Sequence, residues 1–365
     1  MHERTPRILM VRLSAIGDVV NSLPALTALR RRLPSAHIAW LVEDRAASVL
    51  EGHPFLDEIF VFERKRLVRS LKTPSLLCQT PSQVLGFRRR LRRTRFDLLL
   101  DFHGNLKSGL LGTLADARVR VGYDRRNSRE GNFLFNDHHV SLRQERIHRV
   151  EKHLELLGAL GIQPDEACYG LTVPPHARAF AEAYLRRIGQ DSGPIVILHP
   201  GTSASGAHKR WPLEHFAALA DRLVRHASAR VLVTSGPGEF DLACSVARQC
   251  ASELSLPETP SLQHLTGLIE RASVFVSADT GPMHLAAALH VPVVALFGPK
   301  DPVIYGPYGT ASRILQAGLD CSPCGGRRCD DPVCMRSIAP EKALNAVLEL
   351  LPSERGKPSD PGDCR

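Results

Sequence analysis

The chain has 365 residues, of which 43% are apolar, so it is long enough for two domains with packed cores and is not globally disordered. No apolar run reaches the roughly 18 residues of a membrane-spanning helix, and no secretory signal is visible, so we expect a cytoplasmic protein. The net charge of +9 lies in the first half, because residues 1–170 carry 28 Lys and Arg against 19 Asp and Glu, whereas residues 171–365 carry 19 of each.

This charge asymmetry indicates that the first half meets an anionic partner. RNA, an anionic membrane surface and an acidic substrate all fit. Much of the excess lies in RKRLVRSLK (64–72) and FRRRLRRTR (87–95), and solvated basic helix faces are the simpler interpretation of either run.

The first half alternates apolar runs with helical patterns. This βαβ order predicts a parallel sheet covered by helices. The expected strands lie within 7–13, 37–43, 58–62, 96–104 and 118–123, and a helical pattern runs from about 144 to 160.

The second half repeats the same order, so the chain is predicted to hold two successive doubly wound α/β domains. Ligands of such sheets bind beyond the carboxyl ends of the strands. The tail, 352–365, is polar and rich in Pro and Gly, and we predict that it is disordered. Strands are expected within 194–201, 230–236, 274–278 and 291–298, and helices over 212–227, 238–250, 281–289 and 340–351.

Polar residues follow the first strand of each half. In SAIGDVV, Asp18 lies near a helix N-terminus, where it is either an N-cap or a general base. In HPGTSASGAHKRWP, small and hydroxyl residues surround the cation of Lys209, as expected of a phosphate-binding loop or of a flexible surface loop.

Two further strand ends of the second half are polar. SGPGEFDLA lacks the spacing of a dinucleotide fingerprint, which disfavours an NAD enzyme; Glu239 is either a ribose ligand or an acid favoured in a first helical turn. SADTGPMHLAAAL places Asp279, Thr280 and Gly281 at a strand-to-helix junction, where free N–H groups bind anions or need a cap.

Three segments together resemble glycosyltransferase family 9, the ADP-heptose:lipopolysaccharide heptosyltransferases. They are RLSAIGDVVNSLPAL, HKRWP and SADTGPMHLAAALHVPVVALFGP, in this order. The resemblance spans residues 7–350 and implies a GT-B fold, in which two Rossmann-like doubly wound domains face each other across a cleft. It implies an acceptor-binding domain over 1–172 and a nucleotide-sugar-binding domain over 173–351.

The resemblance further implies an inverting, metal-independent transfer of heptose from ADP-L-glycero-D-manno-heptose to Kdo or heptose of the lipopolysaccharide inner core. Asp18 matches the family's general base, and Lys209 matches the residue that neutralises the diphosphate leaving group. The implied donor contacts are Asp279 to the sugar, Thr202, Thr280 and Gly281 to the diphosphate, Glu239 to the ribose, and His284, whose role the resemblance does not assign.

The acceptor side is implied by DFHGNLKSG (101–109), in which Asn105 and Lys107 match acceptor contacts. His103 stands where the family has Gln. The expected partners are ADP-heptose, a lipid A–Kdo or heptosylated core acceptor, and the anionic cytoplasmic face of the inner membrane, which the protein would contact peripherally. No catalytic cofactor and no nucleic acid are expected.

Four cysteines form the pattern C-x₂-C-x₄-C-x₄-C: Cys321, Cys324, Cys329 and Cys334. Such a cluster predicts a structural Zn²⁺ site, with a redox-active C-x-x-C pair or plain reduced thiols as alternatives. Two alternatives to the overall function also stay open. One is a transferase or epimerase that uses another nucleotide sugar on the same fold, and the other is a non-catalytic basic protein that binds RNA or membrane.

Overall fold

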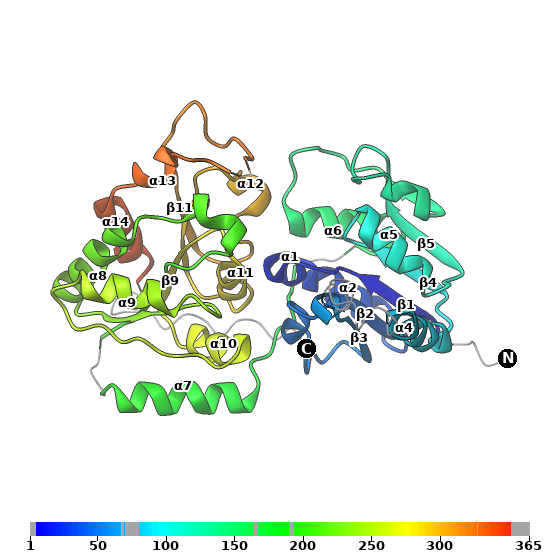
Figure 1. The fold of residues 1–365 in the computed structure, drawn as a ribbon, viewed down its shortest axis with the longest axis horizontal. Helices are drawn as coiled ribbons and strands as arrows, with labels where there is room; N and C mark the ends of the chain where they lie inside the picture. The colour runs from blue at the N-terminus through cyan, green and yellow to red at the C-terminus, as the bar shows by residue number, and fades with distance from the viewer. Residues whose placement is uncertain are drawn as a thin grey trace. The chain divides into compact units, whose positions relative to one another are not determined.

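The computed structural model describes residues 5–66, 69, 80–163, 167–189, 193–326 and 328–351. The chain divides into two compact units, unit 1 (Met1–Thr172) and unit 2 (Val173–Arg365), which are taken in turn (Figure 1). The tail predicted to be disordered, 352–365, and part of the basic run 64–72 lie outside the described residues. None of the described helices is both long and apolar enough to cross a bilayer.

Unit 1 is built on a six-stranded parallel sheet in the order β3-β2-β1-β4-β5-β6. The order reverses between β1 and β4, which is the switch point where doubly wound sheets bind ligands. The strands are β1 (Arg7–Val11), β2 (His37–Glu43), β3 (Glu58–Phe62), β4 (Leu98–Asp101), β5 (Val119–Tyr123) and β6 (His138–Val140).

Both faces of β1 are buried, which explains why the strand reads as an unbroken apolar run. Leu9 and Val11 pack with Leu91 of α4 and Leu111 of α5, and the alternate residue Met10 is equally buried. The described helices of unit 1 are α1 (Ile16–Val20), α2 (Leu23–Arg32), α4 (Thr80–Thr94), α5 (Leu106–Thr113) and α6 (Arg149–Gly158), with short 3₁₀ turns η1 (Ala47–Val49) and η3 (Asn132–Phe135).

Unit 2 is built on a five-stranded parallel sheet in the order β11-β10-β9-β7-β8, which reverses between β7 and β9. The strands are β7 (Ile195–His199), β8 (Arg230–Val233), β9 (Val274–Ala278), β10 (Val293–Leu296) and β11 (Ser312–Leu315). The helices are α7 (Pro175–Arg187), α8 (Leu213–Ala227), α9 (Phe240–Arg248), α10 (Leu262–Glu270), α11 (Gly281–Ala288), α12 (Pro302–Tyr305), α13 (Val333–Arg336) and α14 (Pro340–Leu350), with the 3₁₀ turn η4 (Ala204–Lys209).

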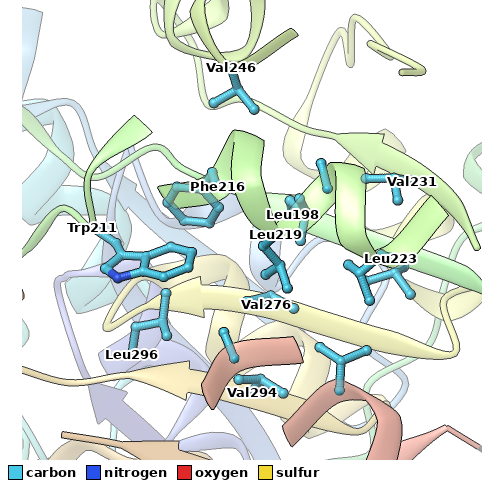
Figure 2. Packing of buried hydrophobic residues seen from close by; sticks show 14 of the residues in the cluster. Leu198, Trp211, Phe216, Leu219, Leu223, Val231, Val246, Val276, Val294 and Leu296 are labelled. Atoms are coloured by element: carbon cyan, nitrogen blue, oxygen red, sulfur yellow. The ribbon is translucent and has the colours of Figure 1, made fainter. Parts of the chain in front are cut away.

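The core of unit 2 lies between the sheet and the helices α8, α9 and α14. Figure 2 shows Phe216 and Leu219 of α8 above Val276 of β9, with Trp211 at one end of the same layer. Trp211 is fully buried and its indole N–H donates to the carbonyl of Ile338 at 2.9 Å, so the ring is fixed in position. In Figure 1 the strands of unit 2 lie between α8 and α14 on one side and α11 on the other.

One local prediction is wrong in its bounds, and one helix of unit 2 was not predicted. The helix expected over 144–160 is α6, which is shorter and begins at Arg149 after His148, whose ring accepts the N–H of Val150. Residues Pro175–Arg187 form α7, a helix that the sequence analysis did not predict. Its buried stripe consists of Ala177, Ala181 and Tyr184, and two alanines give a weak apolar signal.

Candidate active site

The switch point of unit 1 is occupied by an ion pair that joins the ends of β1 and β4. Arg12, the residue after β1, is 5% exposed; its Nη1 donates to the carbonyl of Phe102 at 2.7 Å. Its Nη2 lies 2.6 Å from Oδ1 of Asp18 in α1. Asp18 therefore lies at the switch point, at the predicted strand end, and is held there by a cation that the sequence reasoning missed.

Asp18 is ionised at neutral pH. Burial opposes its ionisation, but the Arg12 guanidinium, Arg149 and the N–H of Ala15 together hold the pKa of its carboxyl well below the usual range. The Ala15 N–H donates to Oδ2 at 3.2 Å, so Asp18 also caps α1 from the first turn. Its side chain stays 32% exposed, which leaves the carboxylate accessible to a hydroxyl group.

His103, the residue at which this chain departs from the family pattern, lies in the electrostatic field of Asp18 and Arg12. Burial, followed by the charge of Arg12, lowers the pKa of its imidazole to about 3, so the ring is neutral at pH 7. Its backbone N–H donates to Asp101 at 2.9 Å, and its Nδ1 is buried without a partner among the described residues. A polar ligand at this switch point would find a free imidazole nitrogen.

The two predicted acceptor contacts are already engaged within unit 1. Lys107 forms a 2.5 Å ion pair with Glu43, which is fully buried at the end of β2 and also faces Arg45 at 3.3 Å. Asn105 is the N-cap of α5, where its Oδ1 accepts the N–H of Ser108 at 3.1 Å. The capping role of Asn105 is therefore established, and its role toward an acceptor stays a prediction.

A further cation of unit 1 lies on α6. Lys152 packs over the Tyr123 ring, 4.1 Å from its centroid, and its Nζ donates to the carbonyl of Asn127 at 2.8 Å. Burial, followed by the charges of Arg149 and Arg12, lowers the pKa of Lys152 to about 7. No pattern in the sequence singled out Lys152, because its neighbours come from distant segments.

The switch point of unit 2 is closed by a second ion pair. The ammonium of Lys209, at the end of η4, lies 2.8 Å from Oδ2 and 2.8 Å from the carbonyl oxygen of Asp279, which follows β9. His284 lies on the other side, with its Nε2 3.7 Å from Oδ1 of Asp279. Despite burial, the neighbouring His284 ring and the charge of Lys209 lower the pKa of Asp279. His284 thus faces the carboxylate of Asp279.

The N-terminus of α11 carries no side-chain cap. Thr280 is the N-cap residue, but its hydroxyl makes no capping hydrogen bond, and its Oγ1 is buried without a partner among the described residues. Gly281 begins the helix and is followed by Pro282. The first N–H groups of a helix carry partial positive charge, so this uncapped end next to Lys209 suits an anionic ligand.

Glu239 and Thr202 lie at the neighbouring strand ends. Glu239 is the N-cap residue of α9, and two glycines leave room for its carboxylate: a Cβ at Gly201 would lie 2.3 Å from Oε2, and one at Gly236 would lie 2.8 Å from it. Burial raises the pKa of Glu239, against the effect of Arg210. Arg210 also approaches the buried hydroxyl of Thr202, at 3.4 Å. All the predicted donor residues therefore gather at one edge of the sheet of unit 2.

The four cysteines are not arranged as a metal centre. Cys321, Cys324 and Cys329 are exposed, Cys334 is buried, and each is a free thiol. Throughout the described part of the chain, no group of three or more His, Cys, Asp or Glu side chains is positioned to hold a metal ion. The predicted zinc site is therefore not supported by the geometry.

Comparison with known proteins agrees with this architecture. The model of glycosyltransferase family 9 (heptosyltransferase) matches residues 84–333. Lipopolysaccharide heptosyltransferase 1 of Pseudomonas aeruginosa is 28% identical over 371 aligned positions, which cover 94% of this chain and 98% of the relative. The enzyme of the same name from Escherichia coli K12 is 28% identical over 315 positions, which cover 85% of this chain and 93% of the relative.

Solved structures give the same result for the fold. A family 9 glycosyl transferase from Veillonella parvula superposes with a TM-score of 0.81 at 23% identity, covering 96% of this chain and 98% of that one. Escherichia coli heptosyltransferase WaaC with ADP superposes with a TM-score of 0.74 at 25% identity, covering 94% of this chain and 99% of that one. The predicted GT-B class, two parallel-sheet α/β domains, is confirmed.

The fold and the site define a glycosyltransferase. The chain belongs to glycosyltransferase family 9, and it is a heptosyltransferase of lipopolysaccharide core biosynthesis.

Proposed function

We propose that this heptosyltransferase moves heptose from ADP-heptose to Kdo or heptose of the lipopolysaccharide inner core, with inversion at the anomeric carbon and without a catalytic metal. The observation that carries the proposal is the Lys209–Asp279 pair beside the uncapped N-terminus of α11. Solved relatives include WaaC with ADP and with ADP-2-deoxy-2-fluoro heptose, which supports an ADP-linked donor.

The donor would bind at the switch point of unit 2. Thr280, Gly281 and the free N–H groups of α11 suit the diphosphate, and Lys209 adds positive charge beside it. Asp279 is an acid and would be repelled by phosphate, so it serves the hydroxyl groups of the sugar. Glu239, in the pocket between Gly201 and Gly236, suits the hydroxyls of the ribose.

In the transfer, a hydroxyl oxygen of the acceptor attacks the anomeric carbon of heptose from the side opposite the diphosphate. The bond between that carbon and the phosphate oxygen breaks, and its electron pair stays on ADP. Asp18 takes the hydroxyl proton. Its low pKa makes it a weak base, so proton transfer comes late, when bond formation has made the hydroxyl strongly acidic.

The acceptor would bind at the switch point of unit 1, where positive charge gathers. The charges of Arg149, Arg12 and Arg129 all act on the pKa of Lys152. A carboxylate or phosphate of the acceptor suits this group. The same excess of positive charge supports peripheral contact with the anionic cytoplasmic face of the inner membrane.

Acceptor binding should depend on pH through Lys152. A lysine with its pKa lowered to about 7 is charged below that pH and neutral above it, so an anionic acceptor loses a cation as pH rises. We expect the KM for acceptor to rise between about pH 6 and pH 8 in the wild type, and Lys152→Met to show a high KM at every pH. A wild-type KM for acceptor that stays constant over this range would show that the charge of Lys152 does not contribute to acceptor binding.

The donor is tested most simply by thermal unfolding with a set of nucleotide sugars. A ligand at about 100 times its Kd stabilises the native state by about 2.7 kcal/mol, which raises Tm measurably. We expect ADP-heptose and ADP to raise Tm, and UDP- and GDP-sugars to leave it unchanged. If no ADP-linked ligand raises Tm, the proposed donor is wrong.

A further inference from the structure

A cavity of about 770 Å³ opens at the carboxyl edge of the sheet of unit 2. Its lining comes from three segments that are distant in the sequence: the turn η4, which includes His208 and Lys209; Lys300, which follows β10; and the cysteine-containing loop, through 326 and 328–330. The volume is typical of a small-molecule site. Lys209 therefore faces an open cavity that two other cations share, Lys300 and Arg328.

The positive charge of Lys209 is partly neutralised within unit 2. Its ammonium donates to both the carboxylate and the carbonyl of Asp279, which leaves one of its three N–H groups for a ligand. Among the described residues, no acidic side chain forms an ion pair with Lys300 or Arg328, and the described contact of the Lys300 ammonium is the Tyr305 ring, 5.6 Å from its centroid. Asp330 is the acid of the lining, so cations outnumber acids there by three to one.

His208 adds a polar group without a partner. Its side chain is 9% exposed, and its Nε2 is buried without a hydrogen-bond partner among the described residues. Burial, followed by the charge of Lys209, lowers the pKa of the imidazole, while contact with the backbone of Gly326 opposes this shift. The ring thus connects η4 to the cysteine-containing loop and fixes that loop beside Lys209.

We propose that Lys300 and Arg328 bind the diphosphate of the nucleotide, both in the donor and in the nucleoside diphosphate that leaves. This inference rests on the proposed function and extends it to two residues outside the family motifs quoted above. The leaving group gains one negative charge when the sugar–oxygen bond breaks. Lys209 is partly neutralised by Asp279, so Lys300 and Arg328 add to the charge with which Lys209 stabilises the developing anion. The cysteine-containing loop is then one wall of the phosphate site.

The test compares binding of ADP and adenosine, which share the base and the ribose but not the phosphates. The variants are Lys300→Ala, Arg328→Ala and the double variant, with charge-preserving Lys300→Arg and Arg328→Lys. The control is Lys342→Ala, an exposed lysine on α14 outside the cavity lining. We expect each alanine variant to weaken ADP binding about tenfold, as for a charged hydrogen bond, and to leave adenosine binding unchanged. The charge-preserving variants should bind ADP more tightly than the matching alanine variants, and the control should bind ADP like the wild type.

Each outcome separates this inference from the proposed function. If wild type binds ADP and the double variant binds it equally well, Lys300 and Arg328 do not contact the diphosphate, and the proposed donor stands. Equal loss of ADP and adenosine binding would also overturn the inference, because it indicates damage to the fold. If the wild type does not bind ADP at all, both the proposed donor and this inference fail.

Discussion

An Asp18→Asn variant should fold and lose sugar transfer by a factor of about 10²–10⁴, the usual contribution of a general base. The amide keeps the size of the side chain and can still accept the Ala15 N–H, but it cannot take a proton from the acceptor. Arg12, which is 5% exposed, would lose its ionic partner and keep the carbonyl of Phe102. We therefore also expect a lower Tm, because an unpaired buried charge destabilises the native state.

The measurement is the transfer rate well below the Tm of the variant, with Asp116→Asn as control. Asp116 is 63% exposed and pairs with Arg92 at 3.5 Å, so its substitution removes the same charge from a surface ion pair. Because Arg12 and Arg149 hold the pKa of Asp18 so low, Asp18 stays ionised throughout the neutral range, and the rate should show no acidic limb from Asp18 above about pH 5. Normal turnover by folded Asp18→Asn enzyme would exclude Asp18 as the base.

A Lys209→Met variant should lose about 10²–10³ in kcat, the usual effect of removing one group that stabilises a developing anion. The substitution also leaves Asp279, whose side chain is 13% exposed, with His284 as its remaining close partner. Removing one member of a buried pair can destabilise the native state by about 3 kcal/mol. Lost activity alone would therefore not distinguish a catalytic Lys209 from a structural one.

The double variant Lys209→Met with Asp279→Asn separates the two roles. Removing both charges relieves the unpaired carboxylate, so the free energy of unfolding should recover toward the wild-type value. Transfer should stay low, because neither the leaving group nor the sugar regains its contact. If the double variant recovered transfer together with stability, Lys209 would act only as the partner of Asp279.

The strand ends could be predicted from the sequence because their signal is local. Each apolar run ends in polar or small residues, and parallel sheets place these ends at one edge, so Asp18, Lys209 and Asp279 were identified before any contact was known. The two interpretations of Asp279–Gly281, a helix cap and a ligand site, concern the same backbone N–H groups. The structure has no side-chain cap on α11, and its free N–H groups are available to a ligand.

The partners of these residues could not be predicted, because they depend on long-range packing. Arg12 reads as the end of an apolar strand, yet its guanidinium bonds to a carbonyl 90 residues away. Lys107 reads as a free cation, yet it pairs with Glu43, 64 residues away. His284 follows Asp279 by five residues, and this spacing alone could have suggested that the two side chains meet across the first turn of α11.

Lys300 and Arg328, the further cations of the cavity, were still harder to predict from the sequence. Lys300 follows a strand, as a ligand-binding residue should, but Arg328 lies in an irregular loop whose most visible feature is its cysteines. That feature led to the prediction of zinc, whereas the described geometry places the loop against Lys209 and Lys300. The position of this loop in the fold favours a wall of the phosphate site over a zinc site, and no local sequence pattern encodes that position.

The central proposal is that Asp18 acts as the base and Lys209 stabilises the leaving group when heptose is transferred from ADP-heptose. The direct measurement is to incubate the protein with ADP-heptose and truncated core acceptors, from Kdo-bearing lipid A upward, and to identify the products by mass. The account predicts one added heptosyl unit on one of these acceptors, release of ADP in equal amount, and no product from the Asp18→Asn variant. If ADP-heptose binds and no acceptor gains mass, or if a different nucleotide sugar is consumed instead, the account is wrong.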